Sequence, residues 1–72
     1  MKNKNIGNFI SECRKAKGLT QKQLADKLYV SDKAVSKWER NICLFDISLI
    51  QPLADILGVS VNELLEGKHL MI

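Results

Sequence analysis

The spacing of apolar residues between Gln21 and Arg40 is the feature that most constrains the fold of this chain. Counted from Gln21, apolar side chains stand at the fourth, fifth, eighth, tenth, fifteenth and eighteenth places: Leu24, Ala25, Leu28, Val30, Val35 and Trp38. The first three share one face of a helix, and so do the last two. This spacing predicts two short helices, over residues 21–28 and 32–40, joined by a three-residue turn. A small side chain such as that of Ala25 allows the two helices to cross closely.

Both helices of this pair are preceded by side chains that can cap an N-terminus. Thr20 precedes the first helix, and Gln23 stands three residues later, in the capping-box position. Ser31 precedes the second helix, and the carboxylate of Asp32 complements the positive end of its dipole. We therefore expect a turn over residues 29–31.

Three further segments have helical periodicity. Residues 4–17 carry one apolar stripe, formed by Ile6, Phe9, Ile10 and Cys13. Another segment is capped by Asp46 or Ser48 and reaches Leu57, and the last covers residues 61–65. No segment reads as a strand, so the sequence predicts an all-α, compact five-helix bundle.

The length of the chain limits it to one domain. A chain of 72 residues forms a single unit at most. We expect this domain to span residues 1–72, with a core over about residues 6–66. A domain of this size buries only roughly 60% of its unfolded surface, which disfavours a deep enzymatic pocket.

Positive charge is concentrated in the N-terminal part of the sequence. Residues 1–41 have a net charge of +6, whereas residues 42–72 have a net charge of −3. The outward face of the helix over residues 32–40 is mostly cationic. A solvated surface would explain this face equally well, but the asymmetry along the chain favours a polyanionic partner.

Several classes of function find no support in the composition. No apolar run approaches the roughly 20 residues of a membrane span, and no signal-peptide core follows the basic N-terminus, so we expect a cytoplasmic protein. Cys13 and Cys43 lack the spacing of a zinc site, and a cytoplasmic location disfavours a disulfide between them. We expect no metal, no cofactor and no small-molecule ligand. Scattered carboxylates without a paired His or Cys nucleophile also argue against an enzyme.

Three stretches of the sequence stand in an informative order and spacing. They are residues 19–25 (LTQKQLA), residues 30–40 (VSDKAVSKWER), and residues 53–60 (LADILGVS) followed by Glu63, Leu64 and Leu65. In these stretches the chain resembles the helix-turn-helix family of phage repressors and Cro proteins, also called the XRE family. The resemblance implies a lambda-repressor-like fold and a sequence-specific regulator of transcription, most often a repressor. Its partner would be double-stranded operator DNA, bound by a homodimer.

The resemblance also implies roles for individual residues. The exposed positions of the recognition helix, which meet base edges and the nearby backbone, are matched by Asp32, Lys33, Ser36 and Lys37. Gln21 resembles the family glutamine that holds a DNA phosphate. Arg14 and Glu39 match a family ion pair that connects the first and third helices.

The chemistry of these side chains is compatible with those roles. Lys33 or Lys37 can donate to guanine O6 and N7, and Asp32 can accept from cytosine N4. Ser36 can serve either purpose. Three further side chains are better placed for phosphates, which position a protein without specifying sequence: Lys22, Lys27 and Arg40.

The sequence departs from the family pattern at two places. Tyr29 stands at a turn position usually held by glycine, where a left-handed backbone is often needed. The recognition positions also lack the glutamine or asparagine side chains that often read adenine, so the preferred bases stay open.

The apolar residues near the C-terminus have more than one interpretation. They are Leu64, Leu65, Leu70, Met71 and Ile72. They either close the core or pair two protomers, and we favour the pairing. The alternative function is a protein-interaction module, in which an antitoxin-like domain engages a partner through this segment.

Overall fold

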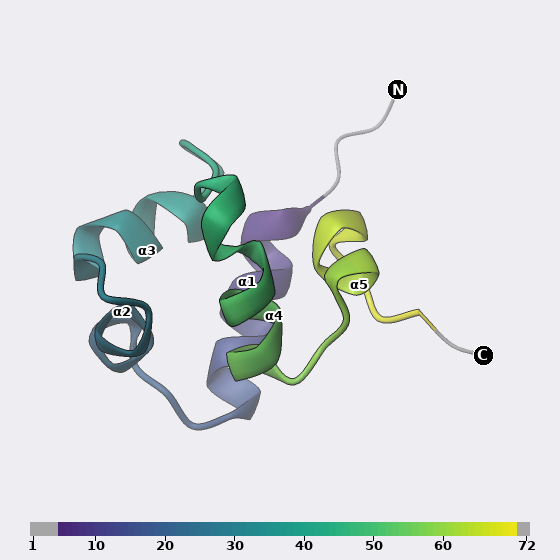
Figure 1. The fold of residues 1–72 in the computed structure, drawn as a ribbon, viewed down its shortest axis with the longest axis horizontal. Coiled ribbons are helices and arrows are strands. Elements are labelled where there is room, and N and C mark those ends of the chain that lie inside the picture. Colours follow the sequence, from purple (N-terminus) through teal and green to yellow (C-terminus); the bar gives the residue numbers. More distant parts are fainter. Residues whose placement is uncertain (1–4, 71–72) are drawn as a thin grey trace.

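The computed structural model describes residues 5–70, which form five α-helices and one short 3-10 helix and contain no strand (Figure 1). The elements are α1 (Ile6–Ala16), α2 (Gln21–Leu28), α3 (Asp32–Glu39), η1 (Ile47–Leu49), α4 (Ile50–Leu57) and α5 (Val61–Glu66). The predicted all-α five-helix fold is confirmed. The expected start of the first helix at Lys4 lies outside the described residues.

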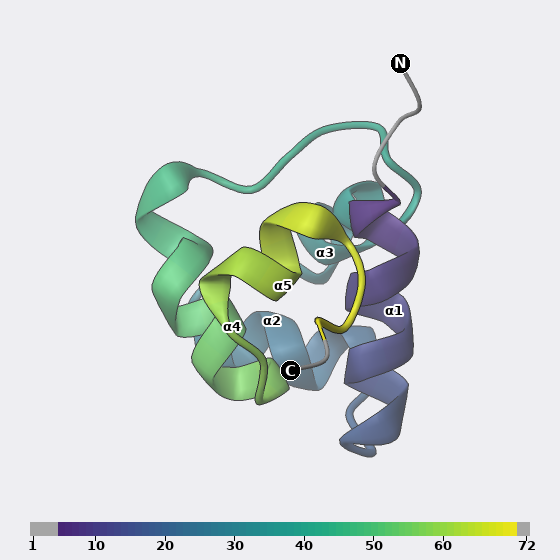
Figure 2. The same cartoon turned by 90° about the vertical axis from the view of Figure 1, so that its right-hand side faces the viewer.

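The five helices enclose one core. Each contributes a side chain with no exposed surface: Ile10, Leu24, Val35, Leu53 and Leu64. In Figure 1, α1 and α4 lie in the middle, with α2 and α3 on one side and α5 on the other. Figure 2 shows α5 lying across α1 and α4. Because each fully buried Leu, Ile or Val contributes roughly 1.5–3 kcal/mol, the helices depend on one another for their stability.

The predicted N-caps of the helix pair are confirmed. Thr20 Oγ1 accepts from the amide of Gln23 at 3.0 Å, and Gln23 Oε1 accepts from the amide of Thr20 at 2.8 Å. Ser31 Oγ accepts from the amide of Ala34 at 3.1 Å. These bonds satisfy helix N–H groups that have no partner inside the helix, and they fix where α2 and α3 begin.

The segment before α4 differs from the expectation in detail. Asp46, and not Ser48, is the cap: its Oδ2 accepts from the Ser48 amide at 3.0 Å and from the Ser48 hydroxyl at 2.6 Å. This cap begins η1, and the α-helix itself starts only at Ile50. Pro52 therefore lies in the first turn of α4, where its missing N–H removes no hydrogen bond within the helix.

Three other helix ends differ from the expected ends by one residue each. α1 ends at Ala16 and α3 ends at Glu39, each one residue early, and α5 continues to Glu66. Arg40 leaves the helix because its ψ angle is 5°. Terminal turns commonly differ by this much, since the last carbonyl groups have no partner within the helix.

The C-terminal apolar residues do not behave as one group. Leu64 is fully buried in the core, whereas Leu65 and Leu70 keep 43% and 38% of their surface exposed. Met71 and Ile72 lie outside the described residues. The core-closing interpretation therefore holds for Leu64, and the exposed leucines stay available to a partner.

The two cysteines lie in different environments. Cys13 is buried, Cys43 is exposed, and both thiols are free. Within residues 5–70, no helix is long and apolar enough to cross a bilayer.

Candidate nucleic-acid interface

A tight turn holds α2 and α3 together. Tyr29 ends α2 with a left-handed backbone, at φ 60° and ψ 39°, as the turn position predicted. The amide of Val30 then donates to the carbonyl of Ala25 at 3.0 Å, which closes the turn. Ala25 is 1% exposed, so a larger side chain would have no space where the two helices cross. The turn thus fixes the angle at which α3 leaves α2.

The outward face of α3 is a continuous polar stripe. Its members follow the i, i+3, i+4, i+7 spacing that places side chains on one side of a helix: Lys33, Ser36, Lys37 and Arg40. The three cations are exposed and Ser36 is half-buried. Arg40 Nε donates to the carbonyl of Ser36 at 3.3 Å, which directs the guanidinium along the stripe. We call these four residues the α3 stripe.

The opposite face of α3 anchors the helix in the core. Val35 has no exposed surface and Trp38 is 5% exposed. The Trp38 and Phe45 rings pack in a T-shaped arrangement, with ring centroids 5.8 Å apart. Trp38 is therefore a core residue, as expected, and cannot stack on a base. Asp32 is exposed in the first turn of α3, where a carboxylate stabilises the positive end of the helix dipole.

The candidate phosphate ligands on α2 differ in how free they are. Lys27 is exposed, and Lys22 Nζ lies 3.5 Å from Asp26 Oδ1 in a surface pair that is well solvated. Gln21 is more constrained, because its Nε2 donates to Glu39 Oε1 at 3.0 Å. An amide nitrogen carries two hydrogens, so one donor of Gln21 remains for another acceptor.

An ion pair ties α1 to α3 beneath this surface. Arg14 Nε lies 2.7 Å from Glu39 Oε2, and Arg14 Nη2 donates to Glu39 Oε1 at 3.1 Å. The third nitrogen, Nη1, donates to the carbonyl of Leu19 at 2.8 Å. The side chains are only 10% and 7% exposed. The pair that the sequence suggested is therefore present, largely buried and bidentate.

The protonation of Glu39 reflects this environment. Burial by itself would raise the pKa of Glu39, but hydrogen bonds from Arg14 and Gln21 and the charge of Arg14 outweigh it. The net effect lowers the pKa of Glu39 below its ordinary value. The carboxylate stays ionised at neutral pH and holds α1, α2 and α3 in a fixed arrangement.

Two residues that sequence reasoning missed bring α1 against the end of α3. Asn41 has a left-handed backbone at φ 60°, and its Oδ1 accepts from the amide of Gly7 at 3.0 Å. A Cβ atom on Gly7 would lie 2.5 Å from the carbonyl oxygen of Trp38, so only glycine fits. The tolerance of asparagine for a left-handed backbone was the available signal for Asn41.

The comparison with family models agrees with this geometry. A model described as "Helix-turn-helix" matches residues 10–64, which include α2, the turn and α3. The chain belongs to this helix-turn-helix family.

Two similar proteins are regulators of transcription. The chain is 37% identical over 62 residues to the HTH-type transcriptional activator BcrR of Enterococcus faecalis, covering 86% of this chain and 30% of BcrR. It is also 37% identical over 65 residues to the HTH-type transcriptional regulator SinR of Bacillus subtilis, covering 89% of this chain and 59% of SinR. The chain thus spans less than two thirds of the length of either relative.

Two similar solved structures contain DNA. The P22 c2 repressor protein in complex with a synthetic operator has a TM-score of 0.84 and 29% identity, over 92% of this chain and all of that one. SinR in complex with DNA has a TM-score of 0.75 and 36% identity, over 83% of this chain and 97% of that one. The lambda-repressor-like fold expected from the sequence is confirmed.

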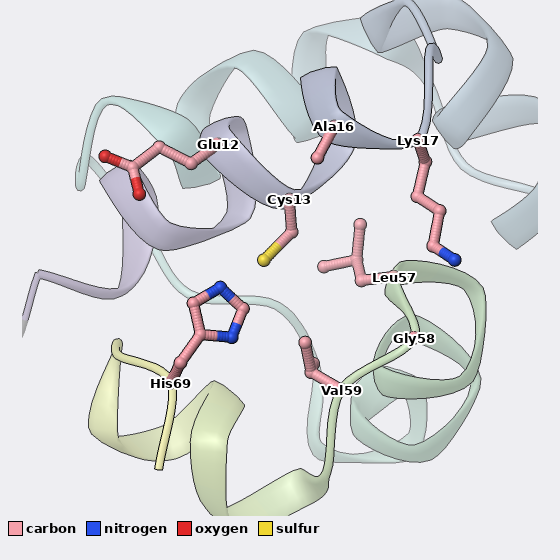
Figure 3. Close-up of a pocket in the computed structure, with 8 residues that line it drawn as sticks. All are labelled: Glu12, Cys13, Ala16, Lys17, Leu57, Gly58, Val59 and His69. Carbon is pink, nitrogen blue, oxygen red and sulfur yellow. The ribbon is translucent and has the colours of Figure 1, made fainter. Parts of the chain in front are cut away.

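A pocket lies elsewhere on this helix-turn-helix domain. It has a volume of about 440 Å³ and is lined by residues of α1, the end of α4, the segment that follows α4, and His69 (Figure 3). Cys13 Sγ points into it beside the His69 ring, and Glu12 and Lys17 stand at its two ends. No residue of α2 or α3 lines the pocket.

The chemistry of this pocket is not that of a nucleophile. Burial raises the pKa of the Cys13 thiol, and the negative charges of Glu12 and Glu63 raise it further. Reactive cysteines need the opposite shift, since the thiolate is the nucleophile. Cys13 therefore stays protonated at neutral pH and serves as a small core residue.

Proposed function

We propose that this chain is a sequence-specific domain for double-stranded DNA in a regulator of transcription, and that it acts as a repressor. The observation that carries the proposal is the α3 stripe. It is an exposed, mostly cationic face on a helix whose other face is fixed in the core by Val35 and Trp38. A helix-turn-helix domain places such a helix in the major groove. Such a role would place the protein in the cytoplasm with the DNA.

The four base-reading residues are Asp32, Lys33, Ser36 and Lys37. Recognition helices read bases chiefly through their N-terminal residues, and these four lie in the first six positions of α3. Lys33 and Lys37 are exposed, and each ammonium group can donate to guanine O6 and N7. Asp32 suits cytosine N4 and would repel a phosphate, which gives it a role in excluding incorrect sites.

The phosphate ligands in this proposal are Gln21, Lys22, Lys27 and Arg40. Gln21 has one donor free and stands at the N-terminus of α2, whose unpaired amides also favour an anion. The Arg14–Glu39 pair supports this site indirectly, because Glu39 orients the Gln21 amide. These contacts would fix the register of α3 on the duplex without selecting a sequence.

A homodimer completes the proposal. Leu65 on α5 and Leu70 beyond its end leave apolar surface exposed, which a second protomer could cover. Two recognition helices would then meet half-sites roughly 34–36 Å apart. Sedimentation equilibrium of the wild type and of Leu65→Glu tests the interface. The dimer would be refuted if, at every protein concentration, the wild type bound operator DNA as a monomer.

Selection from a random duplex pool, followed by fluorescence anisotropy on the best site, tests DNA recognition. We expect Lys33→Ala or Lys37→Ala to weaken binding by roughly 1–3 kcal/mol, and to do so less on scrambled DNA. Lys68→Ala is the matched control, because Lys68 is an exposed lysine beyond α5 and away from the stripe. Equal affinity of the wild type and both α3 variants would refute base reading by this helix.

Salt dependence separates phosphate contacts from base contacts. If a dimer touches on the order of ten phosphates, log affinity should fall steeply with log salt, with a slope near −9. Lys27→Ala should reduce the magnitude of that slope by about 1 per protomer. A slope near zero for the wild type would contradict an electrostatic footprint on DNA.

The exposed leucines also favour a second candidate function, a protein-interaction module. In that case Leu65→Glu would abolish an association that nuclease treatment leaves intact, whereas Lys37→Ala would leave it unchanged. Failure of the random pool to yield any bound duplex, combined with this pattern, would favour the module over DNA recognition.

A further inference from the structure

Tyr29 combines two features that the fold itself does not explain. It is the first residue of the α2–α3 turn and has a left-handed backbone, at φ 60° and ψ 39°. Its side chain is 95% exposed. Residues other than glycine and asparagine adopt this backbone conformation only at an energetic cost. Because the side chain is almost entirely solvated, burial of the ring does not offset that cost.

The backbone of the turn does not require a tyrosine. The Tyr29 amide donates to the carbonyl of Asp26 at 3.3 Å, a bond that glycine would make equally well. The next turn bond, from Val30 to Ala25, is also between backbone atoms. A strained residue that the local structure does not need is an indication of a role outside the fold.

The position of Tyr29 indicates where that role lies. It stands two residues before Ser31, the N-cap of α3, and therefore at the end of α3 that carries Asp32 and Lys33. In Figure 1 the connection between α2 and α3 lies at the edge of the molecule farthest from α5. Two exposed cations, Lys27 and Lys33, and two exposed carboxylates, Asp26 and Asp32, flank it in sequence, so the charge around the phenol is balanced.

We propose that the Tyr29 hydroxyl donates a hydrogen bond to a DNA backbone phosphate beside the groove that α3 enters. This inference rests on the proposed DNA-binding function and adds a ligand to it. A phenol is a neutral donor, so it positions the duplex without releasing a counterion. Its contact also carries no sequence information, because phosphates are the same at every base pair.

Two substitutions separate the hydroxyl from the backbone strain. Tyr29→Phe keeps the strain and the ring and removes only the donor. We expect an unchanged melting temperature and roughly three- to tenfold weaker binding, on selected and scrambled duplexes alike. Tyr29→Gly removes the strain as well. We expect its melting temperature to rise by a few degrees while its affinity falls as far as that of Tyr29→Phe.

The salt slope distinguishes this contact from an ionic one. For both Tyr29 variants the slope of log affinity against log salt should equal that of the wild type, whereas Lys27→Ala should reduce it. Wild-type affinity of Tyr29→Phe would overturn the proposal. So would a lower melting temperature of Tyr29→Gly, because the ring would then support the fold.

Failure of the proposed function has a different signature. In that case neither the wild type nor the Lys68→Ala control would bind any duplex, and the inference would fall with it. The inference alone is refuted if the wild type and the Lys68→Ala control bind, the Tyr29 variants bind with the same affinity, and the Lys33→Ala and Lys37→Ala variants bind more weakly.

Discussion

Replacing Arg14 by methionine tests the ion pair that holds α1, α2 and α3 together. Methionine keeps much of the length of the arginine side chain, so the loss concerns hydrogen bonds and charge more than packing volume. Three bonds disappear: two to the Glu39 carboxylate and one, of 2.8 Å, to the carbonyl of Leu19. The Glu39 side chain, which is only 7% exposed, would keep its carboxylate without its cation.

The structure sets the size of the effect. Breaking a buried ion pair by removing one partner costs about 3–5 kcal/mol, mainly because a charge is stranded. The lower end applies to Glu39, since Gln21 still donates to it at 3.0 Å. An unpaired Leu19 carbonyl adds about 1 kcal/mol. We therefore expect a loss of about 4 kcal/mol, close to the whole stability of a domain of this size.

Urea unfolding followed by far-UV circular dichroism is the assay. Trimethylamine N-oxide at a fixed concentration keeps a folded baseline for the weak variant, because this osmolyte strengthens burial. The double variant with Arg14→Met and Glu39→Met is the control, as it removes both charges. It should lose less than the sum of the two single variants, with a coupling of at least about 2 kcal/mol.

Two results would refute this reasoning. One is a loss below about 1 kcal/mol in Arg14→Met, which would mean that the pair is solvated in solution. The other is strict additivity in the double variant, which would mean that the two side chains stabilise the fold independently of each other.

Three further predictions concern the framework around the α3 stripe. Gly7→Ala places a Cβ atom 2.5 Å from the Trp38 carbonyl oxygen and should lower the free energy of unfolding by about 3 kcal/mol. Its control is Gly18→Ala, at φ +73° with open space around it, which should lower the free energy of unfolding by about 1 kcal/mol. Equal losses of the two variants in urea unfolding would contradict the close approach at Gly7. Thr20→Ala removes the capping box of α2 and should cost about 1 kcal/mol, measured as a melting temperature lower by about 4–8 °C; an unchanged melting temperature would show that the cap is dispensable. The pKa of Glu39 is lowered in the folded state, so the stability that this carboxylate contributes should be complete above its ordinary pKa of 4.5 and should be lost as the pH falls through the lower folded-state pKa. The free energy of unfolding of Glu39→Gln should therefore decline less steeply over that acidic range. Identical pH profiles of the wild type and the variant would exclude this carboxylate as the cause.

The helix pair and its caps were predictable because they depend on residues close together in the sequence. The capping box joins Thr20 and Gln23, which are three residues apart, and the apolar period of α2 and α3 repeats within each helix. The left-handed backbone at residue 29 was implied by the family resemblance, because glycine usually holds that turn position. Such features are set by backbone sterics and by hydrogen bonds within one turn of chain.

The start of α4 was less predictable for a related reason. Asp46 and Ser48 both have side chains that can cap a helix, and sequence alone left the choice open. The structure selects Asp46, which begins η1, because its carboxylate accepts two hydrogen bonds from Ser48. Competition between two adequate caps depends on small differences in geometry that composition does not express.

The amino-acid sequence by itself thus determined five helices, the Thr20 and Ser31 caps of the helix pair and the cationic face of α3, and the family resemblance added the left-handed position of Tyr29. Only the tertiary structure decided that Gln21 shares Glu39 with Arg14, that Gly7 meets the carbonyl of Trp38, and that the Tyr29 ring stays in solvent. The first two contacts join segments that are 18 and 31 or more residues apart. Their existence depends on how the helices pack around a common core, and close packing fixes such distances only when every element is in place.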